Sequence, residues 1–236
     1  MINVLILSGH NSHDWRRTTP LFKKVLEEDG RFNVNVSYAP ENDFLYKDQF
    51  HNVDVMVMDY SGDLWDYQAQ ENFAEAIANG TGLVAIHAAN NWIKGSQSLE
   101  EMMALVFTDE SGHGEFQEFK VEFKEPDHPI LKGMEPFIIE DELYHNCENL
   151  QNVTTYKVLA EAYSNPERGG VGSYQPVLIE NTYGRGKVVL NMLGHVWPKE
   201  FCPGYRGHLM TSVNNESYLK LLVRSCLYVA GEEVTD

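Results

Sequence analysis

Three histidines follow segments that the sequence predicts as β-strands. His10 comes shortly after the first apolar run of the chain, His87 directly after the fourth, and His195 shortly after a late one. Imidazole acts as a general acid or base near neutral pH and is a common metal ligand. Because ligands of an open parallel sheet bind outside the carboxyl ends of its strands, we expect these side chains to share one edge. Each alone could be an ordinary loop residue, so the prediction depends on their convergence.

The segment 141–145 adds two carboxylates, a phenol and an imidazole within five residues. If the segment is extended, Asp141 and His145 share a face by alternation, and if it is helical, they pair four residues apart. Glu142 and His145 are candidate site residues, because functional sites tune the pKa values of carboxylates and imidazoles. For Asp141 we favour a solvent-exposed acidic turn.

Substrate-binding side chains are expected in two loops. His113 lies between two glycines, which allow the backbone to approach a ligand closely or simply form a mobile loop. Trp15 and Arg16 follow the first strand, where an indole can stack on a sugar and a guanidinium can orient a hydroxyl or carboxylate. Trp15 could equally cover the start of a helix. His13 lies in the same loop as these two residues, three positions after His10.

Apolar periodicity predicts the elements that must position these residues. Strands and helices alternate in the first ninety residues, which favours a parallel, doubly wound sheet. The expected strands are Ile2–Leu7, Phe32–Tyr38, Val53–Met58 and Leu83–Ile86, and the expected helices run from Thr19–Pro20 to Asp29 and over residues 66–79.

The second half of the chain has a different pattern. Further strands are expected, and a closing helix around residues 219–230. These strands are Phe116–Phe123, Thr154–Ala160, Pro176–Glu180 and Lys187–Leu193, the last two joined by a hairpin loop at Tyr183–Gly186. No linker or repeat interrupts the chain. We therefore predict one α/β domain over residues 1–236, with antiparallel strands added to a flavodoxin-like sheet.

Composition restricts the partners of this protein. The 236 residues carry 18 lysines and arginines against 35 aspartates and glutamates, a net charge of −17. Such a surface repels nucleic acid and anionic membranes, whereas a small neutral ligand and a homo-oligomer are both compatible with it. The three cysteines show no CxxC spacing, and no run approaches the roughly 20 apolar residues of a membrane span. A cytoplasmic location fits best.

A metal site is a further expectation, and no cofactor motif accompanies it. The sequence lacks the glycine-rich dinucleotide and P-loop patterns, the serine nucleophile elbow and the HExxH pattern. Zinc or another divalent ion could be held by imidazoles with Glu142 nearby. The predicted ligands are His10, His87, His145 and His195. The acidic field of the protein, however, favours protonated histidine, which suits a general acid and opposes metal binding unless carboxylates share the site.

Short motifs extend in order from residue 4 to about residue 200 and together carry a family resemblance. They include Ser8-Gly9-His10, Trp15-Arg16, Ala85-Ile86-His87, Gly112-His113-Gly114, Asp141-Glu142-Leu143-Tyr144-His145, Gly184-Arg185-Gly186 and Leu193-Gly194-His195. Through this series the sequence resembles the trehalose-utilisation (ThuA-like) family. The resemblance implies a fold of the class I glutamine-amidotransferase type, in agreement with the predicted strand and helix order.

The resemblance also implies what the protein does not do. In amidotransferases of this fold a cysteine occupies the sharp turn after a central strand, and His87 stands at that position here. Imidazole cannot form the thioester that glutamine hydrolysis requires. We therefore expect no glutaminase activity.

The family name points to disaccharide use through keto-sugar intermediates. A ketone at C3 of a glycoside acidifies the proton at C2, so a base could remove it while another group holds the enediolate oxygen. His87 or Glu142 is the expected base, and His195 completes the catalytic set. His10 and His145 are expected to bind sugar hydroxyls or a metal. The alternatives are a non-catalytic sugar-binding or regulatory module, and a subunit that acts only with a sugar dehydrogenase.

Overall fold

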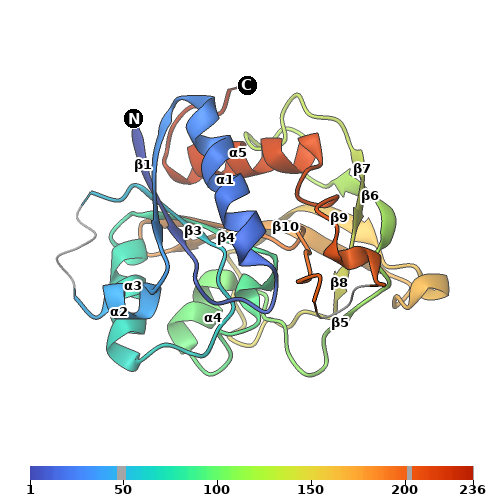
Figure 1. Cartoon of the computed structure of the whole chain (residues 1–236), viewed down its shortest axis with the longest axis horizontal. Coiled ribbons are helices and arrows are strands. Elements are labelled where there is room, and N and C mark those ends of the chain that lie inside the picture. The colour runs from blue at the N-terminus through green and yellow to red at the C-terminus, as the bar shows by residue number, and fades with distance from the viewer. Residues whose placement is uncertain (47–51, 201–203, 236) are drawn as a thin grey trace.

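A nine-stranded mixed sheet organises the computed structural model, which describes residues 1–46, 52–200 and 204–235 (Figure 1). The first five strands in spatial order are parallel and the remaining four antiparallel. Their order is β2 (Phe32–Ser37), β1 (Ile2–Leu7), β3 (Val55–Met58), β4 (Gly82–Ile86), β11 (Gly186–Asn191), β10 (Tyr174–Tyr183), β9 (Lys157–Tyr163), β6 (Gln117–Phe123) and β7 (Phe137–Asp141). This topology confirms the predicted mostly parallel sheet with antiparallel strands from the second half.

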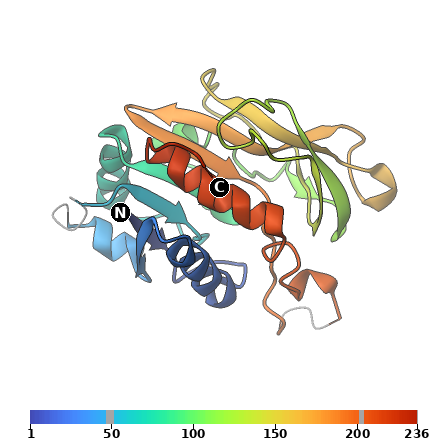
Figure 2. The same cartoon turned by 90° about the horizontal axis from the view of Figure 1, so that it is seen from above.

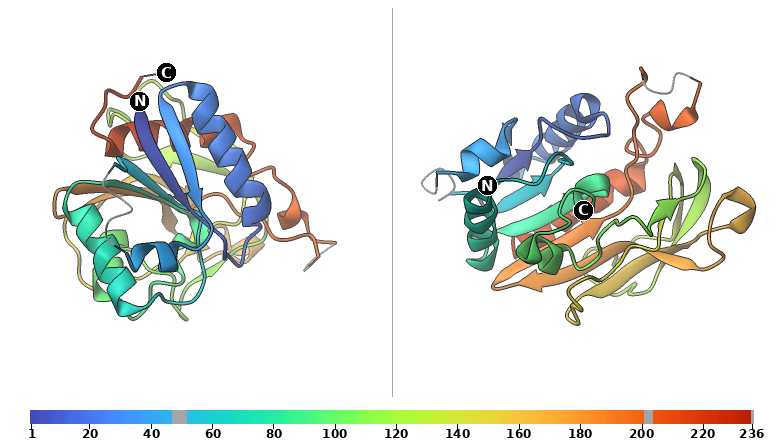
Figure 3. Two further views of the ribbon diagram at one scale, coloured as in Figure 1. Left: turned by 60° about the vertical axis from the view of Figure 1, so that its left-hand side comes forward. Right: turned by 90° about the horizontal axis from the view of Figure 1, so that it is seen from below.

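Helices cover both faces of the sheet. On one face α1 (Trp15–Asp29) lies beside α5 (Glu216–Val229), which lies over the sheet in Figure 2. The view from below in Figure 3 brings the opposite layer forward. That layer contains α2 (Pro40–Phe44), α3 (Tyr67–Ala78) and α4 (Gln97–Met103). Short 3₁₀ turns lie at η2 (His87–Asn90), η3 (Pro166–Arg168) and η4 (Arg206–His208), and a two-stranded ladder pairs β5 (Gly112–His113) with β8 (Tyr144–His145).

Strand β4 shows why the central strands are continuous apolar runs in the sequence. Side chains alternate across a strand, so successive residues face opposite layers. Val84 and Ile86 pack in the apolar cluster under α1 and α5, whereas Leu83 and Ala85 pack in the cluster under α3 and α4. With helices on both faces, neither side of the strand can be polar.

The bounds of most elements differ by a few residues from the sequence-based expectation, and helix α1 and strand β9 are two examples. Helix α1 begins at Trp15, not at Thr19–Pro20, because the amides of Arg17 and Thr18 already donate to the carbonyl of Asp14. Pro20 therefore lies inside the helix, although proline is a typical first-turn residue. Strand β9 starts three residues later than expected, since its register is set by pairing with β6 and β10. Helices α2 and α4 and strand β7 were not predicted.

Two further features bear on the sequence predictions. Among the described residues, every helix is too short or too polar to cross a membrane. Cys147 and Cys226 are free thiols.

Candidate functional site

His87 occupies the sharp turn between β4 and η2. Its backbone φ is +47°, an uncommon value for a residue with a side chain, and the ring is buried. Nδ1 lies 2.7 Å from the carbonyl oxygen of Met192. Because a carbonyl only accepts, Nδ1 carries the proton and Nε2 presents its lone pair. That Nε2 lies 3.3 Å from Nδ1 of His195.

His195 follows β11 through a turn that Asp141 holds. Gly194 has a φ of +117° and donates its backbone N–H to Asp141 Oδ2 at 2.7 Å, while the N–H of His195 donates to Oδ1 at 3.0 Å. Asp141 is 0% exposed, so the expectation of a solvated acidic turn is wrong. Burial raises the pKa of Asp141 to about 7, against the lowering effect of its backbone donors.

His13 completes a cluster of three imidazoles. Its Nε2 lies 3.0 Å from His195 Nδ1, and its ring stacks on Trp197 with centroids 5.1 Å apart. The N–H of His13 donates to Asn11 Oδ1, and Asn11 Nδ2 donates to the buried carboxylate of Asp59. Sequence reasoning placed His13 in the correct loop without giving it a role, because nothing local to the sequence distinguishes it from His10.

Glu142 lies beside this cluster. Its carboxylate is 1% exposed, and Oε2 is 3.0 Å from His195 Nδ1 and 3.3 Å from His113 Nδ1. The hydroxyl of Tyr205 donates to Oε1. Burial alone would raise the pKa of Glu142, but hydrogen bonds from His195 and from the Tyr205 hydroxyl outweigh burial and lower it. The group is therefore a carboxylate at neutral pH.

The three clustered imidazoles are neutral at pH 7. Burial lowers the pKa of His13 and His87 well below the usual value, and neighbouring imidazoles lower it further. Burial also lowers the pKa of His195, although Glu142 opposes this shift. The expectation that the acidic field favours protonated histidine is thus wrong here, because desolvation inside the fold outweighs the distant surface charge.

The remaining predicted residues lie around the cluster or away from it. His113 pairs with Tyr144 in the β5–β8 ladder, and its side chain is 40% exposed, which places it at the rim beside Glu142. His145 is half-buried and lies 3.5 Å from the hydroxyl of Ser164. Burial lowers its pKa.

Three predicted residues lie in or near the loop after β1. His10 is exposed, and its ring centroid is 6.3 Å from that of Tyr60. The guanidinium of Arg16 lies over the Trp15 ring at 4.5 Å, and Trp15 also contacts Tyr38. The structure therefore joins Trp15 and Arg16 to each other at the start of α1.

Among the described residues, one group has the arrangement of a metal site. The ligand atoms of His13, His87 and His195 all lie within 4.8 Å of one another. Of the predicted ligands, His87 and His195 belong to this group, whereas His10 and His145 lie outside it. His13 takes the place that His10 was expected to fill.

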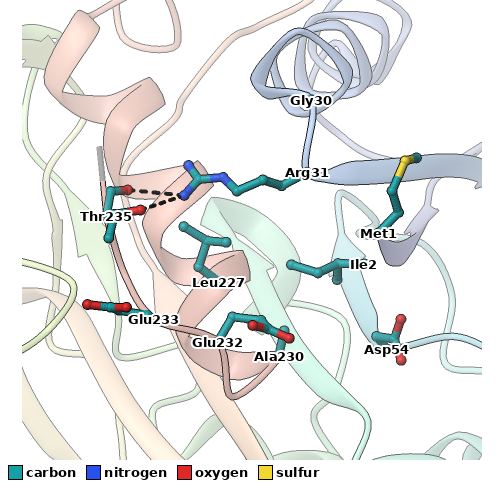
Figure 4. A pocket seen from close by; sticks show the side chains of 10 residues that line it. All are labelled: Met1, Ile2, Gly30, Arg31, Asp54, Leu227, Ala230, Glu232, Glu233 and Thr235. Atoms are coloured by element: carbon teal, nitrogen blue, oxygen red, sulfur yellow. Dashed lines mark hydrogen bonds between the residues drawn. The ribbon is translucent and has the colours of Figure 1, made fainter.

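A hollow at the opposite edge of the sheet is separate from the cluster. Its lining includes Met1, Arg31, Asp54 and Thr235, at the end where β1 begins (Figure 4). The Arg31 guanidinium donates to the Asp29 carboxylate at 2.6 Å and to the Thr235 hydroxyl at 2.9 Å. The guanidinium of Arg31 thus already has partners, and the histidines lie at the other ends of the parallel strands.

Solved structures share this fold at full length and as part of a larger chain. A ThuA-like protein from Parabacteroides merdae is 25% identical with a TM-score of 0.86, over 100% of this chain and 92% of that chain. A cytoplasmic protein from Salmonella typhimurium is 15% identical with a TM-score of 0.58, over 96% of this chain and 98% of that chain. A β-galactosidase from Bacillus circulans is 12% identical with a TM-score of 0.61, over 99% of this chain and 32% of that chain.

A family model identifies the chain more directly. A search of curated proteins finds no match to this chain. The model described as trehalose utilisation, ThuA, matches residues 3–214, a span that includes His13, His87, Glu142 and His195. Since this match covers most of the chain, and a ThuA-like protein shares the fold over its whole length, the chain belongs to the ThuA trehalose-utilisation family.

Proposed function

We propose that this protein acts on a carbohydrate that carries a ketone, of the 3-keto-glycoside kind, by removing the proton next to that ketone. The observation that carries the proposal is the position of Glu142. Its carboxylate is almost fully buried, ionised at neutral pH, and in contact with both His195 and the rim residue His113. A desolvated carboxylate held between two imidazoles is well suited to act as a general base.

Glu142 fits the role of base better than His87 does. The Nδ1 proton of His87 is held by the Met192 carbonyl, and its Nε2 faces His195 inside the cluster. Glu142, in contrast, contacts His113, whose side chain is 40% exposed and can meet an incoming sugar. The catalytic set is therefore Glu142 and His195, with His113 at the entrance and His87 in the cluster behind.

The proposed step transfers one proton. Glu142 takes the proton from C2 of the sugar, and the C2–H electrons form the enediolate, whose negative charge lies on the C3 oxygen. An imidazole N–H beside the carboxylate stabilises that oxygen. Return of the proton to C2 gives epimerisation, whereas departure of the C1 alcohol, which takes up a proton, gives elimination. The C3 ketone itself must come from oxidation of a hydroxyl, so we propose a sugar dehydrogenase as the partner.

Turnover of 3-keto-trehalose in D₂O tests the proposal. We expect NMR to show loss of the C2 proton signal, with or without release of glucose. Glu142→Gln should lower kcat by about 10²–10⁴-fold, the usual contribution of a general base, while KM changes little. Glu71→Gln, the same substitution on the exposed face of α3, is the matched control and should leave kcat unchanged.

A sugar-binding module without turnover is the alternative. It is supported by the histidine at the turn after β4, where an amidotransferase nucleophile would stand. Calorimetric binding of the keto-sugar without any C2 exchange in the unmodified protein would favour this module and contradict the enzymatic proposal. Equal rates for Glu142→Gln and the unmodified protein would also contradict it.

A further inference from the structure

We propose that His13, His87 and His195 bind one divalent transition-metal ion of the zinc type through their ring nitrogens. Glu142 lies beside the ion, where its carboxylate oxygen is a fourth ligand or the partner of a bound water. The site is the one to which the proposed function belongs, but the inference rests on the geometry of the donor atoms and not on any reaction. It can be tested without any sugar. Either proposal can therefore fail without the other.

The spacing of the donor atoms matches a tetrahedral ion. Four ligands at about 2.0–2.1 Å from zinc, placed at the corners of a tetrahedron, lie about 3.3 Å from one another. Nδ1 of His195 lies 3.0 Å from His13 Nε2, 3.3 Å from His87 Nε2 and 3.0 Å from Glu142 Oε2. The three distances from His195 Nδ1 are therefore near those between ligands of one ion, and the ligand atoms of the three histidines all lie within 4.8 Å of one another.

Proton counting favours a cation at the same point. His87 Nε2 presents a lone pair because its Nδ1 donates to the Met192 carbonyl, and Glu142 Oε2 is a side-chain oxygen 3.0 Å from His195 Nδ1. Both atoms face His195 Nδ1, which carries at most one proton and can donate it well to one of them. Lone pairs facing each other at these distances repel. A single cation among them would satisfy the lone pairs that face one another.

The surroundings orient two of the three imidazoles, those of His13 and His87, as metal ligands usually are. A ligating histidine typically donates its second ring nitrogen to a carbonyl, carboxylate or hydroxyl, which fixes the ring and its tautomer. His87 has the Met192 carbonyl, and His13 Nδ1 lies 3.1 Å from the Ser12 hydroxyl. Three nitrogen donors select zinc, cobalt, nickel or copper over magnesium and calcium, which prefer oxygen. When bound, such an ion would supply a Lewis acid for a ketone or enediolate oxygen.

The experiment uses the full-length protein and the metal alone. After dialysis against a chelator, Zn²⁺ is titrated calorimetrically, and Co²⁺ binding is followed by visible absorption, which is strong for tetrahedral cobalt. We expect one ion per chain and a tetrahedral cobalt spectrum. His13→Ala and His195→Ala should each weaken Zn²⁺ binding more than about 100-fold, because losing even an outer-shell partner costs about 10–100-fold.

His10→Ala and His145→Ala are the matched controls, since both residues lie outside the cluster. They should leave the Zn²⁺ affinity and the cobalt spectrum unchanged. Circular dichroism identifies any variant that fails to fold, and His13→Gln then replaces His13→Ala as a milder change at a loop position. The proposal is overturned if the unmodified protein binds less than one tenth of an ion, or if folded His13 variants bind Zn²⁺ as tightly as the controls.

Discussion

Two buried aspartates hold the loops that carry the clustered histidines. Asp141 accepts the backbone N–H groups of Gly194 and His195, so the turn after β11 is tied to the end of β7. Asp59 accepts from Asn11, whose side-chain oxygen in turn accepts the N–H of His13. Neither carboxylate is within the cluster itself. Each positions an imidazole through the backbone of its loop.

Replacing Asp141 tests this positioning role. Asp141→Ala leaves several buried amides without an acceptor, each costing about 1–3 kcal/mol, so we expect the free energy of unfolding to fall by at least about 2 kcal/mol. Urea denaturation measures this change. Zn²⁺ affinity of the folded variant should also drop by about 10–100-fold, the typical effect of an outer-shell partner.

Asp109→Asn provides the comparison for Asp141, because its side chain is 94% exposed. A surface change of this kind shifts stability by about 0.5 kcal/mol or less. Asp141 would have no positioning role if a folded Asp141→Ala protein kept the Zn²⁺ affinity of the Asp109→Asn protein.

At the scale of elements, the close approach of α5 to β4 depends on a glycine. A Cβ placed on Gly82 would lie 2.6 Å from the Cβ of Val229, near the end of α5. Helix α5 packs over β3, β4 and β11 and closes one face of the sheet. Because neither a strand backbone nor a helix terminus can move freely, the contact leaves no room for a methyl group.

Gly82→Ala should therefore destabilise the protein. Inserting a methyl group into a tightly packed interior costs about 1–3 kcal/mol, and we expect a loss of this size in chemical denaturation. Gly204→Ala, where no heavy atom of the described residues beyond the two chain neighbours lies within 4 Å of the added Cβ, should change stability little. Similar denaturation midpoints for the two variants would show that α5 can shift to accommodate the methyl group.

At the same scale, the parallel strands and most of the antiparallel strands of the large sheet were predictable, whereas strand β7 and the exact bounds of several strands were not. Strands β1, β3 and β4 are buried on both faces, so each is a short apolar run that stands out locally. Strand β7 ends in the acidic pair Asp141-Glu142, which resembles a surface turn until its burial is known. The bounds of β9 depend on pairing with strands far away in the sequence.

At the scale of the whole molecule, one carboxylate joins three distant parts of the chain. Glu180 of β10 lies 3.2 Å from Nε2 of His128, in the loop after β6, and accepts the hydroxyl proton of Tyr228 in α5. The hydrogen bond from His128 is the main reason that the pKa of Glu180 lies below its usual value, with further lowering by Tyr228.

This shift predicts how stability depends on pH. A carboxylate whose pKa is lower in the folded protein stabilises it above the unfolded-state pKa, and the benefit is lost as pH falls through the folded-state value. The unmodified protein should therefore be more stable than Glu180→Gln at pH 7, with the difference shrinking below about pH 4.5. Urea unfolding across this pH range measures it. A difference independent of pH would mean that Glu180 acts through packing and not through its charge.

The sequence by itself determined that His87 and His195 would meet. Their strands are recognisable from local apolar runs, and parallel strands bring their carboxyl ends to one edge. The family resemblance added the fold type, and the match to the family over residues 3–214 agrees with it. Glu142 could be selected for its side-chain chemistry, although not for its contacts.

Only the tertiary structure decided which other residues join them. His10 and His13 lie in one loop, and the loop turns His13 inward because Asn11 bonds to Asp59, 48 residues away. The burial of Asp141 likewise depends on Gly194, 53 residues away. Such hydrogen bonds join segments that are far apart in the chain, and the loops involved show no periodic pattern in the sequence. The chemistry of each side chain was therefore predictable from the sequence, whereas its position required the folded protein.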